Sequence, residues 1–225
     1  MWCVPEIDNE FVERMEDVLR LYARRYNPNE PVVAFDERPV VLHDSARKGT
    51  PVEPGRLPRT DYEYVRCGTA NIFCIVEPLT GQRLTHVTQN RKSRSFAWAL
   101  TRIARRYRHA RRIHLVLDNL STHAESAVIA AYGPRKGSQL WRRFTVHYTP
   151  KHASWLNAAE LEASLVAREC LGRRRMADYV YLKKQVKLWT RRTNRQRRFI
   201  RWKFRVNDAR RVFRYNGITT RRSEH

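Results

Sequence analysis

The first regular pattern along the chain is an amphipathic helix, predicted over residues 8–26 with Asp8 or Asn9 as its N-cap. Its apolar positions recur three or four residues apart, at Phe11, Met15, Val18 and Tyr22. The pattern then changes to the apolar run of a strand over 32–42, and this run contains a carboxylate, Asp36.

Further strands and helices alternate along the rest of the chain. Strands are predicted at 62–76, 83–88, 113–117 and 144–148, and helices at 93–108, 125–132, 154–171 and 178–193. Gly- and Pro-containing stretches at 48–61 and 133–138 predict loops. The order of elements predicts one α/β domain built on a mixed sheet with helices on its faces. The stretch from Arg191 onward is expected to be the most loosely packed part.

Composition narrows the class of protein. The 225 residues are 42% hydrophobic, which excludes disordered and collagen-like chains. No apolar run approaches the ~20 residues that span a bilayer. The first ten residues are too acidic for a secretory signal, and Cys3, Cys67, Cys74 and Cys170 have no C-x-x-C spacing. A reducing cytoplasm is therefore the expected location.

Charge indicates the partner. Lys and Arg number 45 against 22 Asp and Glu, a formal net charge of +23. Such a chain is expected to bind polyanions, because each phosphate that it neutralises releases condensed counterions. Basic segments at 91–112, 173–175 and 191–214 are candidate DNA contacts, and the last also contains Phe199, Trp202, Phe204, Phe213 and Tyr215. Trp202 and Phe204 have the alternative role of packing the last segment onto the core.

Three acids lie where a soluble core does not place them without a reason. Asp36 lies inside a strand, Asp118 ends the strand IHLVL, and Glu160 lies one turn into a helix. Carboxylates of this kind hold Mg²⁺, and two such ions can promote phosphodiester chemistry. The three acids meet that requirement if the two strands are neighbours. Each acid alone could equally be a cap or a surface charge.

The sequence around these acids resembles one known family. The segments are VAFDE (33–37), LDNLSTH (117–123) and YTPKHASWLNAAE (148–160), with DYEY from Asp61, NIF from Asn71, WKF (202–204) and DAR (208–210) in support. Together they resemble the catalytic domain of IS630-family (Tc1/mariner-related) transposases, from about Trp2 to Arg214. The resemblance implies an RNase H-like (retroviral integrase-like) α/β fold with a five-stranded mixed sheet, DNA as partner, and Mg²⁺ or Mn²⁺, two ions, as cofactor.

Carried over residue by residue, the resemblance assigns the catalytic and metal-binding D-D-E triad to Asp36, Asp118 and Glu160. Six further residues occupy motif positions or the loop and helix next to the site and are predicted to support the triad or contact DNA: Glu37, Asn119, His123, Lys151, His152 and Asn157. His123 is expected to act through hydrogen bonds rather than as a metal ligand. Glu162 is expected to point away from Glu160, since helix residues two apart do not share a face.

The helix that carries Glu160 has its own set of expectations. Ser154 is predicted to cap it. Asn157 shares the face of Glu160 and is expected to orient that carboxylate or contact a phosphate. Trp155 and Leu156 are expected in the core, and Lys151 and His152 are either phosphate contacts or a solvated loop.

The predicted organisation is an N-terminal helix and linker (1–30), a catalytic core (31–175) and a C-terminal helix with an Arg-rich tail (176–225). Family members carry N-terminal helix-turn-helix domains, and this sequence begins at the boundary of the catalytic domain. The resulting hypothesis is a mobile-element transposase domain of the bacterial cytoplasm that cleaves element ends and transfers strands, as a homodimer or with a partner chain that supplies end recognition. The alternatives are a DNA-binding remnant without catalysis and another RNase H-like nuclease such as a junction resolvase.

Overall fold

The computed structural model describes residues 7–47, 49–50, 53–57, 62–120, 122–172 and 174–215. Cys3 and the start of the chain, Asp61 of the DYEY segment, Ser121 of the LDNLSTH segment and Arg173 lie outside the described residues, as does 216–225. In the described part, no helix is both long enough and apolar enough to cross a membrane.

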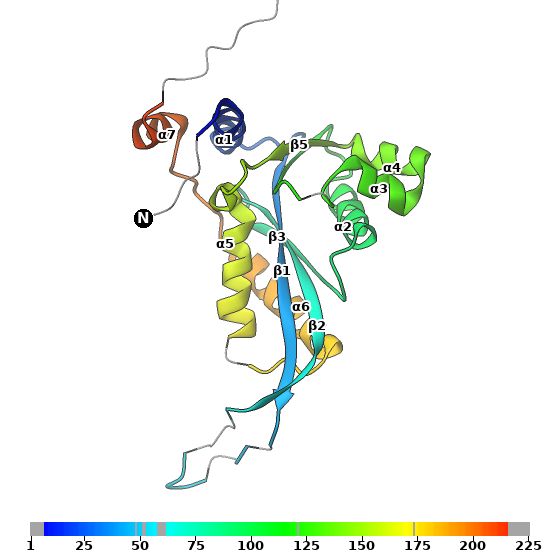
Figure 1. Ribbon diagram of the computed structural model, residues 1–225, viewed down its shortest axis with the longest axis vertical. Coiled ribbons are helices and arrows are strands. Elements are labelled where there is room, and N and C mark those ends of the chain that lie inside the picture. The colour runs from blue at the N-terminus through cyan, green and yellow to red at the C-terminus, as the bar shows by residue number, and fades with distance from the viewer. Residues whose placement is uncertain are drawn as a thin grey trace, which may run out of the picture.

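A five-stranded sheet forms the centre of the fold, in the order β3-β2-β1-β4-β5 (Figure 1). β1 pairs antiparallel with β2 and parallel with β4, so the sheet is mixed, as predicted. Its strands are β1 (Val32–Ser45), β2 (Tyr64–Glu77), β3 (Gln82–Thr88), β4 (Ile113–Leu117) and β5 (Phe144–Tyr148). β4 and β5 have the predicted bounds, because turn residues and charges end both apolar runs sharply.

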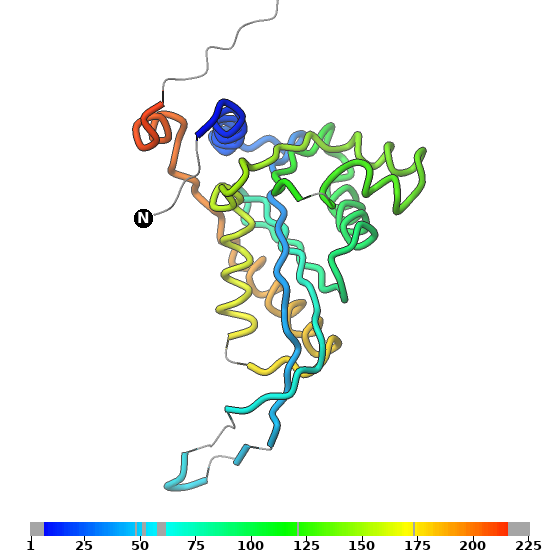
Figure 2. Tube along the Cα trace, viewed as in Figure 1, coloured from blue at the N-terminus to red at the C-terminus, as the bar shows by residue number. Residues whose placement is uncertain are grey.

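Helices cover both faces of the sheet (Figures 1 and 2). The helices are α1 (Asn9–Tyr22), α2 (Ser93–Arg106), α3 (Glu125–Tyr132), α4 (Pro134–Trp141), α5 (Ala158–Leu165), α6 (Tyr179–Gln196) and α7 (Val206–Phe213). A 3-10 turn at Ser154–Leu156 precedes α5, and a π-helical stretch at Val166–Leu171 follows it. α2 and α3 pack on one face of the sheet around Phe35 and Phe73, whereas α1, α5 and α6 pack on the other.

The predicted loop at 133–138 is wrong, because these residues begin helix α4. Gly133 has φ +81° and separates α3 from α4, and Pro134 occupies the first turn, where its missing N–H is tolerated. Gly137 is buried where the two helices cross, and a Cβ there would lie 2.7 Å from the Ile129 Cα. The glycines that indicated a loop therefore serve a helix start and a close helix crossing.

The expectation of loose packing from Arg191 onward holds for burial, since Thr193 and Ala209 are the buried residues among those described at 191–215, but aromatic contacts attach this segment to the core. α6 continues to Gln196, and the following segment packs against α1 and ends in α7. The Trp202 ring lies 5.0 Å from that of Tyr22, and the Phe204 ring lies 5.6 Å from that of Trp155. The packing role of Trp202 and Phe204 is thus confirmed.

Candidate active site

Asp36 and Asp118 lie on neighbouring strands at the centre of the sheet. The parallel register pairs Ala34 of β1 with Val116 of β4, which places Asp36 and Asp118 at corresponding positions two residues further along. Both carboxylates therefore emerge where β4 ends, at the edge where open α/β sheets place their ligands. The condition that the sequence left open, that the two strands are neighbours, is satisfied.

Asp36 is held in a negative environment. Its carboxylate accepts a 2.7 Å hydrogen bond from the Glu37 backbone N–H, which favours the ionised form. Burial has the larger, opposite effect, and the charges of Asp118, Glu160 and Glu37 add to it, so that the pKa of Asp36 rises to about 6. Because three other carboxylates raise the pKa of Asp36, we infer that their negative charges lie near it.

Glu160 reaches this point from the first turn of α5, on the Asp36 side of the sheet. The N-cap of α5 is Asn157 and not Ser154: its Oδ1 accepts from the Ala159 N–H at 3.1 Å. Asn157 is buried, and its Nδ2 donates to the Phe35 carbonyl at 2.8 Å. Asn157 therefore connects the start of α5 to the residue before Asp36, and its side chain is not directed at the Glu160 carboxylate. Ser154 instead donates to Glu160 Oε1 at 3.4 Å.

His123 connects two acids on the other side of the site. Its Nδ1 contacts Asp118, and its Nε2 lies 3.2 Å from Glu37 Oε1. Burial opposes the charged ring, but the hydrogen bonds to Asp118 and then Glu37 prevail and raise the pKa of His123 to about 9. At neutral pH an imidazolium therefore donates hydrogen bonds to both carboxylates.

Glu37 lies on the opposite face of β1 from Asp36, as strand alternation requires. Its Oε2 is buried and has no hydrogen-bond partner, and the Arg91 guanidinium lies 3.7 Å from it. Glu37 therefore faces α2 and lies next to the three acids, and is not one of them.

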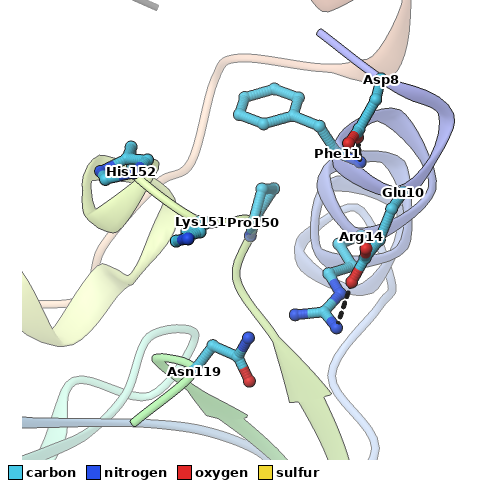
Figure 3. Close-up of a pocket in the computed structure, with 8 residues that line it drawn as sticks. All are labelled: Asp8, Glu10, Phe11, Arg14, Asn119, Pro150, Lys151 and His152. Atoms are coloured by element: carbon cyan, nitrogen blue, oxygen red, sulfur yellow. Dashed lines mark hydrogen bonds and ion pairs between the residues drawn. The ribbon is translucent and has the colours of Figure 1, made fainter. Parts of the chain in front are cut away.

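A hollow of about 450 Å³ opens beside the ends of β4 and β5. Figure 3 shows Asn119, Pro150 and Lys151 facing the first turns of α1 across this hollow. Arg14 of α1 also lines it and pairs with Glu10. His152, with φ +62°, lies in the same loop and is exposed. Asn119, Lys151 and His152 therefore gather on one wall, next to Asp118.

The donor atoms at the site suit a hard divalent cation, because they are carboxylate oxygens. In the described part of the chain, no three His, Cys, Asp or Glu side chains are arranged closely enough to hold a metal ion. Within the site, the Asp118 carboxylate is paired with the His123 ring. The convergence of charge at Asp36 is the feature that fits a cation.

Glu162 points away from the triad, as predicted. It is fully buried and forms a 2.6 Å ion pair with Arg83 of β3. Leu156 is likewise buried and Trp155 packs beside the same cluster, so both belong to the core. Two arginines of the segments predicted to contact DNA have acidic partners instead. Arg91 lies near Glu37, and Arg210 forms an ion pair with Glu16.

Sequence reasoning missed three residues that position the site. The Tyr22 hydroxyl accepts from the Ala158 N–H at 3.0 Å, and the Tyr148 hydroxyl donates to the His123 carbonyl at 2.7 Å. The Phe96 ring lies 4.7 Å from that of His123. Tyr22 and Phe96 were visible in the sequence only as apolar positions of helices, and Tyr148 only as the end of a strand and the start of a motif segment, so their contacts could not be read from it.

A known protein family matches the part of the chain that contains the three acids. The sequence profile of a family described as "DDE superfamily endonuclease" matches residues 31–183. No curated protein matches the chain.

Solved structures match over most of the chain. The Mos1 mariner paired-end complex with Mn is 16% identical, with a TM-score of 0.55 over 87% of this chain and 62% of that one. The Mos1 transposase paired-end complex with the left transposon end is 18% identical, with a TM-score of 0.55 over 85% and 57%. The Mos1 strand transfer complex gives 16% and 0.54 over 87% and 61%. The predicted RNase H-like fold is confirmed, and this chain spans less than two thirds of the length of those chains.

Proposed function

Because the chain belongs to the DDE superfamily endonuclease family, we propose that it is the catalytic domain of a DNA transposase. It would cleave phosphodiester bonds at element ends and join the freed ends to target DNA. The observation that carries this proposal is that Asp36 lies level with Asp118 on the neighbouring strand, and that the charges of Asp118 and Glu160 both raise the pKa of the buried Asp36 carboxyl. The segments LDNLSTH and SWLNAAE support the IS630 branch of the family.

The triad would hold Mg²⁺ or Mn²⁺ through Asp36, Asp118 and Glu160. Bound divalent ions of this kind polarise phosphate oxygens and lower the pKa of water. Solved Mos1 complexes with Mn and with Mg support the choice of ions. Two ions are proposed, since three carboxylates and a DNA phosphate supply enough oxygen atoms for both.

The chain's own residues would position the DNA and the carboxylates. His123 holds Asp118 and Glu37 through its two ring nitrogens, and α5 presents Glu160 from a helix start fixed by Asn157. Lys151 and His152 offer cationic or donor groups to a phosphate at the rim of the hollow. In the first step, water oxygen forms a bond to phosphorus while the bond from phosphorus to the 3′-oxygen breaks. In the second, the freed 3′-hydroxyl oxygen forms a bond to a target phosphorus in line, while the bond from that phosphorus to the 3′-oxygen of the target strand breaks and that oxygen leaves as a 3′-hydroxyl. Positioning and charge neutralisation carry both steps without a covalent protein intermediate.

The partners follow from the same proposal. Transposon ends and target DNA are the substrates, and the neighbours' paired-end complexes support this assignment. We also propose that the protein works in the bacterial cytoplasm on chromosomal DNA, as a homodimer or with a partner chain that carries helix-turn-helix domains.

The experiment is a nicking assay on supercoiled plasmid with Mn²⁺ or Mg²⁺, comparing Asp36→Asn with Asp44→Asn. Asp44 is a matched control, because it lies in the same strand and accepts a 2.7 Å bond from the next backbone N–H, as Asp36 does, but is exposed and remote from the triad. We expect Asp36→Asn to abolish nicking while Asp44→Asn retains it. Equal nicking by Asp36→Asn and the wild type would overturn the catalytic assignment. DNA binding without nicking by the wild type would indicate the inert remnant.

A further inference from the structure

A second basic site lies along β3, the edge strand of the sheet. α2 covers one face of the sheet beside β3, and α6 covers the other (Figure 1). Two hollows of about 570 and 360 Å³ open along this edge, and Leu84 and Arg102 line both. We call the combined depression the β3 groove. Its cationic lining comes from two helices and the turn after α2: Arg102, Arg105, Arg106, Arg108, Lys183, Lys187 and Arg191.

These cations have no carboxylate partner among the described residues, although Arg106 donates a hydrogen bond to the Gln82 side chain and Arg108 donates one to His109. All seven are exposed, no Asp or Glu lines the groove, and none of the seven forms an ion pair with another described residue. In contrast, Arg83 at one end is buried in its pair with Glu162. A concave surface lined by one sign of charge concentrates counter-ions more strongly than scattered surface charges do.

His86 lines one of the two hollows of the groove. Burial lowers the pKa of His86 to about 4, and the charges of Arg102 and Lys183 add to the effect. The ring is therefore neutral at physiological pH. It stacks on Trp98 of α2 with a centroid distance of 3.7 Å.

Trp98 positions Arg102. The Arg102 guanidinium carbon lies 5.0 Å from the centroid of the indole ring, within the range of a cation–π contact. Because His86 fixes the indole, the guanidinium is ordered before any ligand arrives. A preordered cation loses less side-chain entropy when it binds a phosphate.

The groove lies on the same level of the sheet as the triad. Glu37 pairs with Phe73, and Phe73 pairs with His86, so the three residues form one row across β1, β2 and β3. Two antiparallel steps of about 5 Å place His86 about 10 Å from Glu37 at the Cα atoms. A single turn of a DNA duplex, about 34 Å long, can therefore contact both places.

We propose that the β3 groove binds the sugar–phosphate backbone of duplex DNA, as a contact separate from the Asp36, Asp118 and Glu160 triad. Cations of α2 contact phosphates from one side of the groove and cations of α6 from the other, and the contact with Trp98 orients Arg102 before DNA binds. The choice of DNA among polyanions rests on the proposed function, whereas the anionic class of ligand rests on the groove alone.

The test measures binding of a fluorescein-labelled 30-base-pair duplex by anisotropy, in EDTA, at several salt concentrations. The variant is Arg102→Ala, Lys183→Ala, Lys187→Ala. The matched control removes the same charge from exposed positions of α4 and its end: Arg135→Ala, Lys136→Ala, Arg142→Ala. Because each phosphate contact contributes about 0.9 to the salt slope, we expect the groove variant to lose a slope of about 2 to 3 and more than tenfold in affinity relative to the control.

The role of Trp98 is tested in the same assay by a double-mutant cycle of Trp98→Leu with Arg102→Ala. We expect the two losses of binding to be non-additive, because Trp98 acts through Arg102. A merely structural Trp98 would change the melting temperature and leave the two effects on binding independent.

Three results would overturn the proposal: no DNA binding by the wild type, equal weakening of both triple variants, or a groove effect seen with a duplex RNA probe and absent with DNA. EDTA removes any contribution from catalysis. If the groove variant binds DNA more weakly but the wild type does not nick plasmid, the proposed function is contradicted and the groove proposal stands. If the wild type nicks plasmid but the groove variant binds DNA as the control does, the groove proposal is contradicted and the proposed function stands.

Discussion

At the residue scale, two glutamates that are two positions apart in α5, Glu160 and Glu162, have different roles. Glu160 lies at the start of α5 near Asp36, and Glu162 is buried against Arg83. Burial raises the pKa of Glu162, and the nearby Arg83 charge counteracts that rise. Sequence alone separated the two by helix geometry, but it could not identify Arg83 as the partner, because the two residues are 79 positions apart.

The first prediction uses this contrast. Glu160→Gln should abolish plasmid nicking, a loss of about a hundredfold or more, with little change in the free energy of unfolding. Glu162→Gln should lower the free energy of unfolding by about 3 kcal/mol, because it leaves the buried Arg83 charge without its counter-ion. Urea denaturation and the nicking assay on both variants measure the two effects. A Glu160→Gln variant that nicks normally would remove Glu160 from the triad.

At the element scale, the sequence predicted those elements well whose ends coincide with strong local signals. β4, α3 and β5 have the predicted bounds. α4 was missed, because Gly133 and Gly137 were taken as signs of a loop when they serve a helix start and a helix crossing. The N-cap of α5 was misassigned for a related reason: Ser154 begins a separate 3-10 turn, and the true cap, Asn157, is selected by the Phe35 carbonyl of a strand 122 residues away.

A prediction about α5 follows from that contact. Asn157→Ser keeps an N-cap oxygen but is too short to reach the Phe35 carbonyl, so helix stability should change by less than about 1 kcal/mol. Nicking should nevertheless fall, because Glu160 is no longer held in register with Asp36. Asn157→Ala should lose both functions and cost about 1–2 kcal/mol. Full activity in Asn157→Ser would show that the contact only stabilises the fold.

At the scale of the whole molecule, the sequence places Asp36 and Asp118 on strands and Glu160 at a helix start, and their assignment as a triad came from the family resemblance and stays a prediction. The contacts that assemble these elements were not predictable, because they join residues far apart in the chain. The clearest case connects the two ends of the described chain. Glu16 of α1 accepts from Arg210 Nε at 2.9 Å and from the Tyr215 hydroxyl at 3.2 Å, and it also pairs with Arg20.

Removing this junction should release α7 without affecting the triad. Burial would raise the pKa of Glu16, but the hydrogen bond from Arg210 and the charges of Arg20 and Arg210 prevail and lower it below 4.5. A lowered pKa means that the contribution to stability is complete above about pH 4.5 and is lost as the pH falls through the folded-state pKa. We therefore expect Glu16→Gln to reduce the free energy of unfolding by roughly 1–2 kcal/mol at pH 7, with the difference from wild type shrinking in acid. Amide exchange should quicken in α7 (Val206–Phe213) and remain unchanged in β4, because β4 is an interior strand of the sheet and α7 is held mainly through α1 and its neighbouring aromatic residues. Equal exchange in α7 of both proteins would show that the aromatic contacts hold α7 without Glu16.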